Sequence, residues 1–136
     1  MFGKSKSSRQ KRIDSLIGAG TVVRGDIVFE GGLRIDGHVV GNVTAAEGKA
    51  ATLVISEQAR VEGGVEVSHI VINGQVHGPV SALDSLELQP KARIVGDVAY
   101  KVLEMHVGAV VQGRLDPGNA EPGPSAVVEF KRGIKT

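Results

Sequence analysis

The chain has 136 residues, a formal net charge of +1 and no cysteine, so it is long enough for one modest domain without disulfides or a cysteine-ligated metal. Glycine is about twice as frequent as usual, with 19 residues, whereas aromatic residues make up 3% of the chain. Valine and isoleucine far outnumber leucine, which disfavours a helical bundle because β-branched residues lose rotamer freedom in helices. The shortage of aromatic rings likewise disfavours a conventional sandwich or barrel, leaving a β-protein with a narrow aliphatic core.

Residues 1–12 form a basic arm that carries five cations and no acid. They show no periodic apolar pattern, so we expect this arm to be disordered. Cations are attracted to anionic lipid and an apolar tip can insert, which predicts membrane binding. A solubilising tail and a nucleic-acid-binding arm are the alternatives, and the absence of an aromatic stacking platform on the body argues against nucleic acid. The predicted membrane-binding residues are Met1, Phe2, Lys4, Lys6, Arg9, Lys11 and Arg12.

The body, residues 13–116, contains eight basic and 13 acidic residues, so the near-neutral total hides an acidic domain behind a basic arm. Three segments of the body align without gaps: 53–65, 86–98 and 103–115. Residues 15–27 fit the same frame, and 35–43 and 72–80 form a second type of unit. The chain therefore contains six successive units. One glycine recurs in all of them: Gly25, Gly41, Gly63, Gly78, Gly96 and Gly113.

Each unit has about 17 residues with apolar side chains at every second position, which indicates short strands with one face buried. A small polar insertion at residues 46–51 explains the one longer step. Strands this short in a repeat of this length predict one coil of a three-sided parallel β-solenoid, with glycines at the corners.

The two ends of such a solenoid lack a recognisable polar cap. An uncapped end exposes unpaired backbone and an apolar cross-section, so we expect end-to-end self-assembly. The alternative is that the flanking tails fold over the ends. The predicted interface residues are Leu16, Ile17, Val23, Phe29, Leu103, Met105, Val110 and Leu115.

Residues 117–136 begin with a Pro/Gly-rich stretch and are predicted to be flexible. The segment Ala126–Phe130 is more apolar than a linker requires. It either caps the terminal coil or contacts a partner, and the sequence leaves both open.

The body resembles the bactofilins, a family of bacterial polymer-forming cytoskeletal proteins. The resemblance covers residues 15–116 and is carried by Leu16–Gly20, by the V-x-G-x-[VI] repeats and by Gly31–Gly41. Met1–Lys6 is similar to the membrane-targeting peptide of many members. The resemblance implies a right-handed β-helix between disordered tails. It also implies nonpolar filaments that form without nucleotide on the inner face of the cytoplasmic membrane and help to place cell-wall and cell-shape factors. An apolar residue near the C-terminal end is needed for polymerisation in some members, and Phe130 or the last coil is the candidate here.

The alternative is a left-handed hexapeptide-repeat enzyme, either an acyltransferase or a zinc carbonic anhydrase. Its six-residue register starts at Ile17 but soon drifts. The four histidines fall in different coils and registers, so we expect isolated outward side chains and no zinc site. No catalytic triad is recognisable, and the Gly18–Gly20 motif lacks a phosphate-binding context. We therefore predict a cytoplasmic, membrane-peripheral scaffold without catalytic residues or cofactors, whose partners are its own copies, lipid and cell-wall proteins.

Overall fold

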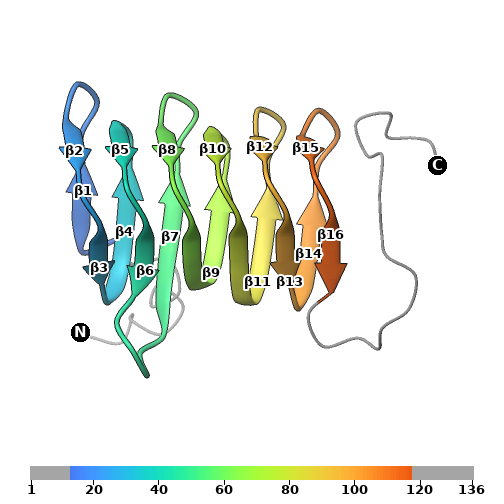
Figure 1. The fold of residues 1–136 in the computed structure, drawn as a ribbon, viewed down its shortest axis with the longest axis horizontal. Helices are drawn as coiled ribbons and strands as arrows, with labels where there is room; N and C mark the ends of the chain where they lie inside the picture. Colours follow the sequence, from blue (N-terminus) through green and yellow to red (C-terminus); the bar gives the residue numbers. More distant parts are fainter. Residues whose placement is uncertain (1–12, 118–136) are drawn as a thin grey trace, which may run out of the picture.

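A computed structural model describes residues 13–117, which form sixteen β-strands and no helix (Figure 1). All strand pairs are parallel, and successive windings follow one another along the long axis of the molecule. Since residues 13–117 contain no helix, this part of the chain has no helix that could cross a membrane. The predicted parallel β-solenoid is confirmed.

Each of the six windings contributes one strand to each of three faces. Face 1 consists of β1 (Ser15–Ile17), β4 (Gly31–Ile35), β7 (Ala51–Ile55), residues 69–72 of β9 (Val65–Ile72), residues 85–88 of β11 (Val80–Leu88) and β14 (Val102–Met105). Face 2 consists of β2 (Val22–Arg24), β5 (His38–Val40), β8 (Arg60–Glu62), β10 (Gln75–His77), β12 (Arg93–Val95) and β15 (Val110–Gln112). Face 3 consists of β3 (Ile27–Phe29), β6 (Val43–Ala45), residues 65–67 of β9, residues 80–82 of β11, β13 (Val98–Tyr100) and β16 (Leu115–Pro117).

The core consists of columns of aliphatic side chains that stack from one winding to the next. On face 1, for example, Ile35, Ile55 and Ile72 lie directly over one another and are completely buried. Branched aliphatic side chains fill this narrow interior, whereas Phe29 and Tyr100, the two aromatic residues within 13–117, pack against it only partly buried. The unusual composition therefore follows from the small cross-section of the solenoid.

The recurring glycines form one corner of the solenoid, between faces 2 and 3. All six have positive φ, with values between 132° and 159°. At Gly63, a side chain would collide with the backbone carbonyl of Gly41, the corner glycine of the preceding winding, and Gly41 is related to Gly25 in the same way. Glycine is therefore required both by the backbone conformation and by the close approach of successive windings.

Polar side chains next to this corner link neighbouring windings. The Oδ1 atom of Asp26 accepts a hydrogen bond of 2.9 Å from the amide of Asn42, whose own Oδ1 accepts one of 2.8 Å from Gly64. Asp97 repeats the contact with Arg114 at 3.1 Å. These bonds satisfy amide groups at a bend, where the regular ladder is interrupted.

The insertion at residues 46–51 is accommodated at the corner between faces 3 and 1. Residues 46–50 leave the solenoid between β6 and β7 as a projecting loop (Figure 1). Both flanking strands keep their parallel partners in the next winding. The extra residues thus bulge from a corner without disturbing the stack.

The glycine corner can be tested with Gly63→Ala. The added methyl group would meet the Gly41 carbonyl, and the φ of +153° disfavours any L side chain. We expect a loss of about 1–3 kcal/mol in the free energy of unfolding, measured by denaturant titration with circular dichroism. Gly18→Ala is the control, because a methyl group at Gly18 meets nothing within 4 Å. Equal stability of the two variants would contradict the proposed steric constraint.

Candidate assembly surfaces

The strands of the first and last windings are edge strands. Within residues 13–117, β1, β2 and β3 pair only with the second winding, and β14, β15 and β16 pair only with the fifth. Each of these strands therefore presents one row of backbone groups that no described strand pairs. Such edges are templates for another strand.

At the N-terminal end, the apolar columns of the core are open. Ile17, Val23 and Phe29 point inward but are only partly buried, whereas the next residues in two of these columns, Ile35 and Val39, have no exposed surface. A strand docked against this end would bury the three side chains further. The predicted interface residues Ile17, Val23 and Phe29 therefore lie on one continuous surface.

The outer surface of the first winding is also apolar. Leu16 on face 1, Val22 on face 2 and Val28 on face 3 are 59%, 50% and 66% exposed, respectively. An aliphatic residue thus lies on each face next to the edge. Cross-strand contacts between apolar side chains stabilise paired strands, so this winding suits an apolar neighbour.

The C-terminal end is more closed. Leu103 and Met105 point inward and are partly buried, but Leu115 is only 1% exposed within one copy. Val110 lies over Arg93 on the outer surface of face 2, and its neighbour Val111 points into the core. The prediction of Val110 as a residue of the open column was therefore wrong, although the alignment of the repeats already places Val110 with Arg60 and Arg93, and Val111 with the buried Val61 and Ile94.

The outer surface of the last winding carries an exposed carboxylate on two of its faces, together with exposed aliphatic side chains at Val102 and Val107. Glu104 on face 1 and Asp116 on face 3 are both exposed. Glu104 lies directly across from Glu87, and the Nε2 atom of His106 is 3.3 Å from a carboxylate oxygen of each. These three side chains could hold a metal ion, since their ligand atoms all lie within 4.8 Å of one another.

The histidines are outward-facing, as predicted, but three of them are not isolated. His38 contacts Glu62 at 3.0 Å, His69 contacts Ser85 at 2.8 Å, and His106 contacts the two glutamates of the last windings. Sequence reasoning missed these contacts because the acids lie in other windings. The histidines do fall in different registers, as predicted: His77 shares a column with Val40, whereas His38 shares one with Gln75.

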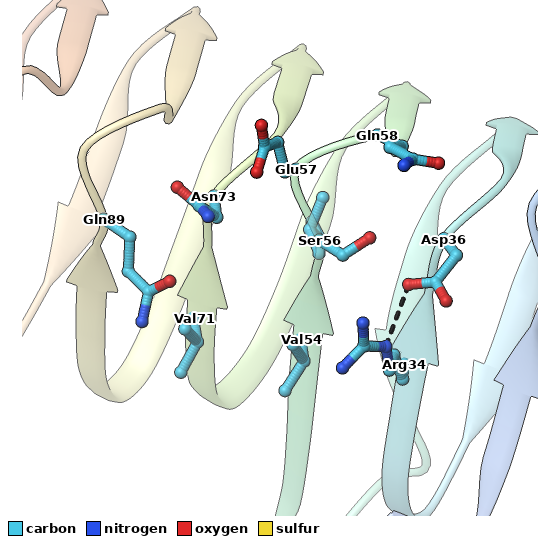
Figure 2. Close-up of a pocket in the computed structure, with 10 residues that line it drawn as sticks. Arg34, Asp36, Val54, Ser56, Glu57, Gln58, Val71, Asn73 and Gln89 are labelled. Atoms are coloured by element: carbon cyan, nitrogen blue, oxygen red, sulfur yellow. Dashed lines mark hydrogen bonds and ion pairs between the residues drawn. The ribbon is translucent and has the colours of Figure 1, made fainter.

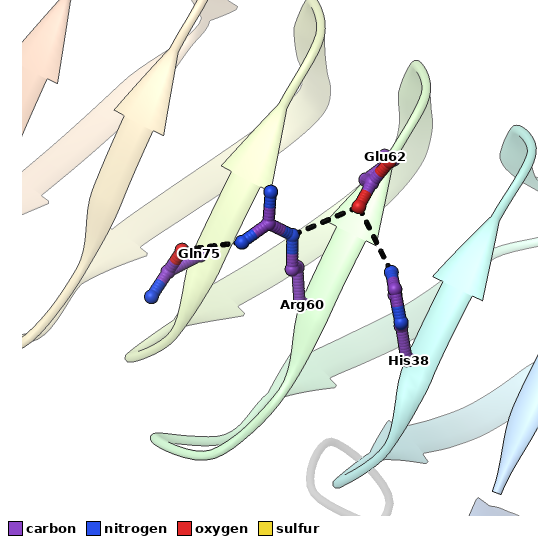
Figure 3. Close-up of polar contacts among 4 residues, drawn as sticks. All are labelled: His38, Arg60, Glu62 and Gln75. Carbon is purple, nitrogen blue, oxygen red and sulfur yellow. Dashed lines mark hydrogen bonds and ion pairs between the residues drawn. The ribbon is translucent and has the colours of Figure 1, made fainter.

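A polar network crosses the middle of face 2 (Figure 3). The Nε atom of Arg60 donates a hydrogen bond of 2.9 Å to Glu62, which His38 also contacts, and Arg60 reaches Gln75 at 3.4 Å. The hydrogen bond from His38, followed by that from Arg60, lowers the pKa of Glu62 below its ordinary value of 4.5. Glu62 is therefore ionised at neutral pH and engaged by its neighbours.

A shallow groove of about 350 Å³ runs along the corner between faces 1 and 2 (Figure 2). Arg34 donates a hydrogen bond of 2.9 Å to Asp36, and Val54 and Val71 form its floor. A hydrogen bond with Ser56, together with Arg34, lowers the pKa of Asp36. No histidine, cysteine or lysine lines this groove, so the base next to Ser56 is the Asp36 carboxylate, whose lowered pKa makes it a weak proton acceptor.

Part of the predicted sites lies outside the described residues. This applies to Phe130 and to all seven predicted membrane-binding residues of the arm, which fall in residues 1–12 and 118–136. Their roles remain predictions.

Comparison with known proteins identifies the family. The family profile described as "Bactofilin: Polymer-forming cytoskeletal" matches residues 15–116, which is the whole solenoid apart from its last residue. The chain belongs to the bactofilin family. This bactofilin is therefore a member of a cytoskeletal, polymer-forming family, as the sequence resemblance implied.

Two curated relatives come from Myxococcus xanthus (strain DK1622). Bactofilin BacP is 28% identical over 120 residues, which cover 88% of this chain and 48% of BacP. Bactofilin BacO is 30% identical over 103 residues, which cover 76% of this chain and 79% of BacO. The chain thus spans about half the length of BacP. No solved structure shows a significant match. None of these matches supports the alternative of a hexapeptide-repeat enzyme.

The network on face 2 predicts a pH dependence. Because its pKa is lowered in the folded state, Glu62 contributes stability that is fully present above pH 4.5 and is lost as the pH falls through the lowered value. Glu62→Gln should therefore reduce the melting temperature at pH 7, and the difference from wild type should disappear in strongly acidic solution. Glu66→Gln, which removes a charge from face 3, is the control. A difference that persists unchanged at low pH would contradict this assignment.

Proposed function

We propose that this bactofilin assembles without nucleotide into nonpolar filaments, in which like ends of the solenoid meet. The filaments lie on the inner face of the cytoplasmic membrane, are held there by residues 1–12, and help to localise cell-wall and cell-shape factors. The observation that carries the assembly part is the pair of open sheet edges on a parallel solenoid of a polymer-forming family. Strand pairing and burial of the open columns would supply the contacts of such a polymer, which supports assembly without nucleotide.

The side chains at the two ends favour joints between like ends. In a head-to-tail stack that continued the columns of the solenoid, Glu104 would lie against Leu16 and Asp116 against Val28. Such a joint places two carboxylates on aliphatic neighbours, whereas on face 2 it places Val110 on Val22. Two N-terminal ends instead bring aliphatic residues together, whichever faces meet, because all three faces carry one.

The joint between two C-terminal ends brings acidic side chains together. Glu104 and Asp116 are both exposed at that end. Like charges facing one another are unfavourable and are screened by salt. We therefore expect this joint to be the weaker one and to strengthen as the ionic strength rises.

The assembly can be tested by placing charge inside one end at a time. Leu103→Arg should block the C-terminal joint and leave dimers joined at their N-terminal ends, because arginine cannot be buried in the apolar column without a partner. Ile17→Arg should likewise leave dimers, and the double variant should be monomeric. Light scattering after size-exclusion chromatography, without nucleotide, measures the mass.

Two matched controls add the same charge at the same ends but outside the columns. Val107 is 84% exposed on a turn of the last winding, and Ala19 is exposed on a turn of the first. Val107→Arg and Ala19→Arg should both form filaments in electron micrographs. If Leu103→Arg or Ile17→Arg alone gave monomers, the assembly would be head-to-tail. If both variants still formed filaments, the ends would be excluded as the interface.

The arm can be tested separately. A chain that lacks residues 2–6 loses the apolar residue Phe2 and two lysines, so its sedimentation with anionic vesicles should fall strongly. Because the deletion leaves the solenoid intact, assembly in the absence of lipid should not change. Vesicle binding equal to that of the full chain would remove the arm from the proposal.

A further inference from the structure

Charge is distributed unequally over the three faces of the solenoid. The strands of face 2 carry three arginines, Arg24, Arg60 and Arg93, and one acid, Glu62. The strands of face 1 carry one arginine and two glutamates, and those of face 3 carry two acids and no cation. Face 2 is therefore the one basic face of an acidic body.

The single acid of face 2, Glu62, is already paired with neighbouring side chains. Glu62 is held by Arg60 at 2.9 Å and by His38 at 3.0 Å (Figure 3). The acids at the adjoining corner, Asp26 and Asp97, accept hydrogen bonds from backbone amides of the next winding. The carboxylates on and beside this face are thus engaged within the protein, whereas Arg24 and Arg93 are exposed.

Exposed aliphatic side chains lie between the cations. Val22 and Val95 on face 2 are 50% and 43% exposed. A flat array of arginines and valines without aromatic rings lacks the stacking platform that single-stranded nucleic acids use. Each strand of face 2 is three residues wide, and neighbouring strands lie about 4.8 Å apart. This regular, flat arrangement suits a planar surface of negative charge. Cations and apolar residues in one plane are typical of protein surfaces that adsorb to anionic lipid.

We propose that face 2 is the surface with which this bactofilin lies against a bilayer containing anionic lipids. The proposal rests on the proposed membrane function and deepens it, since it assigns the orientation of the solenoid and not only its tether. One copy binds weakly through so few charges. Stacked copies repeat the same face along an assembly, so that binding strengthens by avidity.

The experiment uses the full chain and vesicles with and without phosphatidylserine. Arg60→Gln combined with Arg93→Gln removes two cations from face 2 in windings away from both ends. One cation near an anionic leaflet contributes about a fivefold gain in binding, so affinity should fall by about tenfold or more. The control is Lys49→Gln combined with Lys101→Gln, which changes the total charge equally at the corner opposite face 2. The control should bind as wild type does, and wild-type binding should weaken as salt rises.

Orientation is read out with single cysteines, since the chain has none of its own. His77→Cys, Val71→Cys and Ser81→Cys place an environment-sensitive fluorophore on faces 2, 1 and 3 of the fourth winding. Vesicles should shift the emission to the blue at residue 77 and leave residues 71 and 81 unchanged. A shift at residue 77 on assembly without lipid would reassign face 2 to contacts between copies and overturn the proposal.

The remaining outcomes separate this proposal from that of the arm. If the arm deletion releases the protein while the face 2 variant and its control bind equally, the arm tethers the protein and the orientation is wrong. If wild type binds anionic vesicles no better than neutral ones, both membrane proposals fail and the assembly proposal stands. If the face 2 variant loses affinity for single-stranded DNA but not for vesicles, face 2 binds nucleic acid and the lipid assignment is overturned.

Discussion

The structure depends on the close, repeated stacking of one winding on the next. At the corner between faces 2 and 3, the backbone of each winding approaches the carbonyl group of the winding before it so closely that no side chain fits. Glycine at this corner permits the spacing that the hydrogen-bonded ladders of all three faces require. The columns of valine and isoleucine then follow, because side chains at equal heights on identical strands lie directly over one another. Corner, ladder and core are thus consequences of a single spacing.

The same stacking connects fold and function. Every interior winding of the solenoid pairs with a winding on each side. The terminal strands have the same geometry and differ mainly in lacking one neighbour. A copy of the chain offers strands of the same geometry. What distinguishes the two ends is side-chain chemistry at matching positions: Leu16 and Val28 on faces 1 and 3 of the first winding correspond to Glu104 and Asp116 of the last. Backbone geometry therefore permits assembly, and the outward residues select which ends meet.

Much of this arrangement could be predicted from the sequence because the repeat is short and its glycines are obligatory. The six units, the corner glycines, the projecting loop at residues 46–50 and the shared column of Val40 and His77 all follow from alignment of the chain with itself. Two features could not be predicted. The contacts of His106 join side chains from two windings and depend on side-chain geometry. The basic character of face 2 became visible only after every strand had been assigned to a face.

The direction of the hydrogen bonds has a mechanical consequence. In a parallel solenoid the bonds between windings run along the long axis, so tension along this axis loads the ladders of all three faces together. Bending instead stretches the hydrogen bonds between windings on one face while those of the other two faces stay intact. The load then falls on fewer hydrogen bonds at a time. The molecule is therefore expected to resist stretching better than flexing, in the manner of a stiff rod that fails by opening on one side.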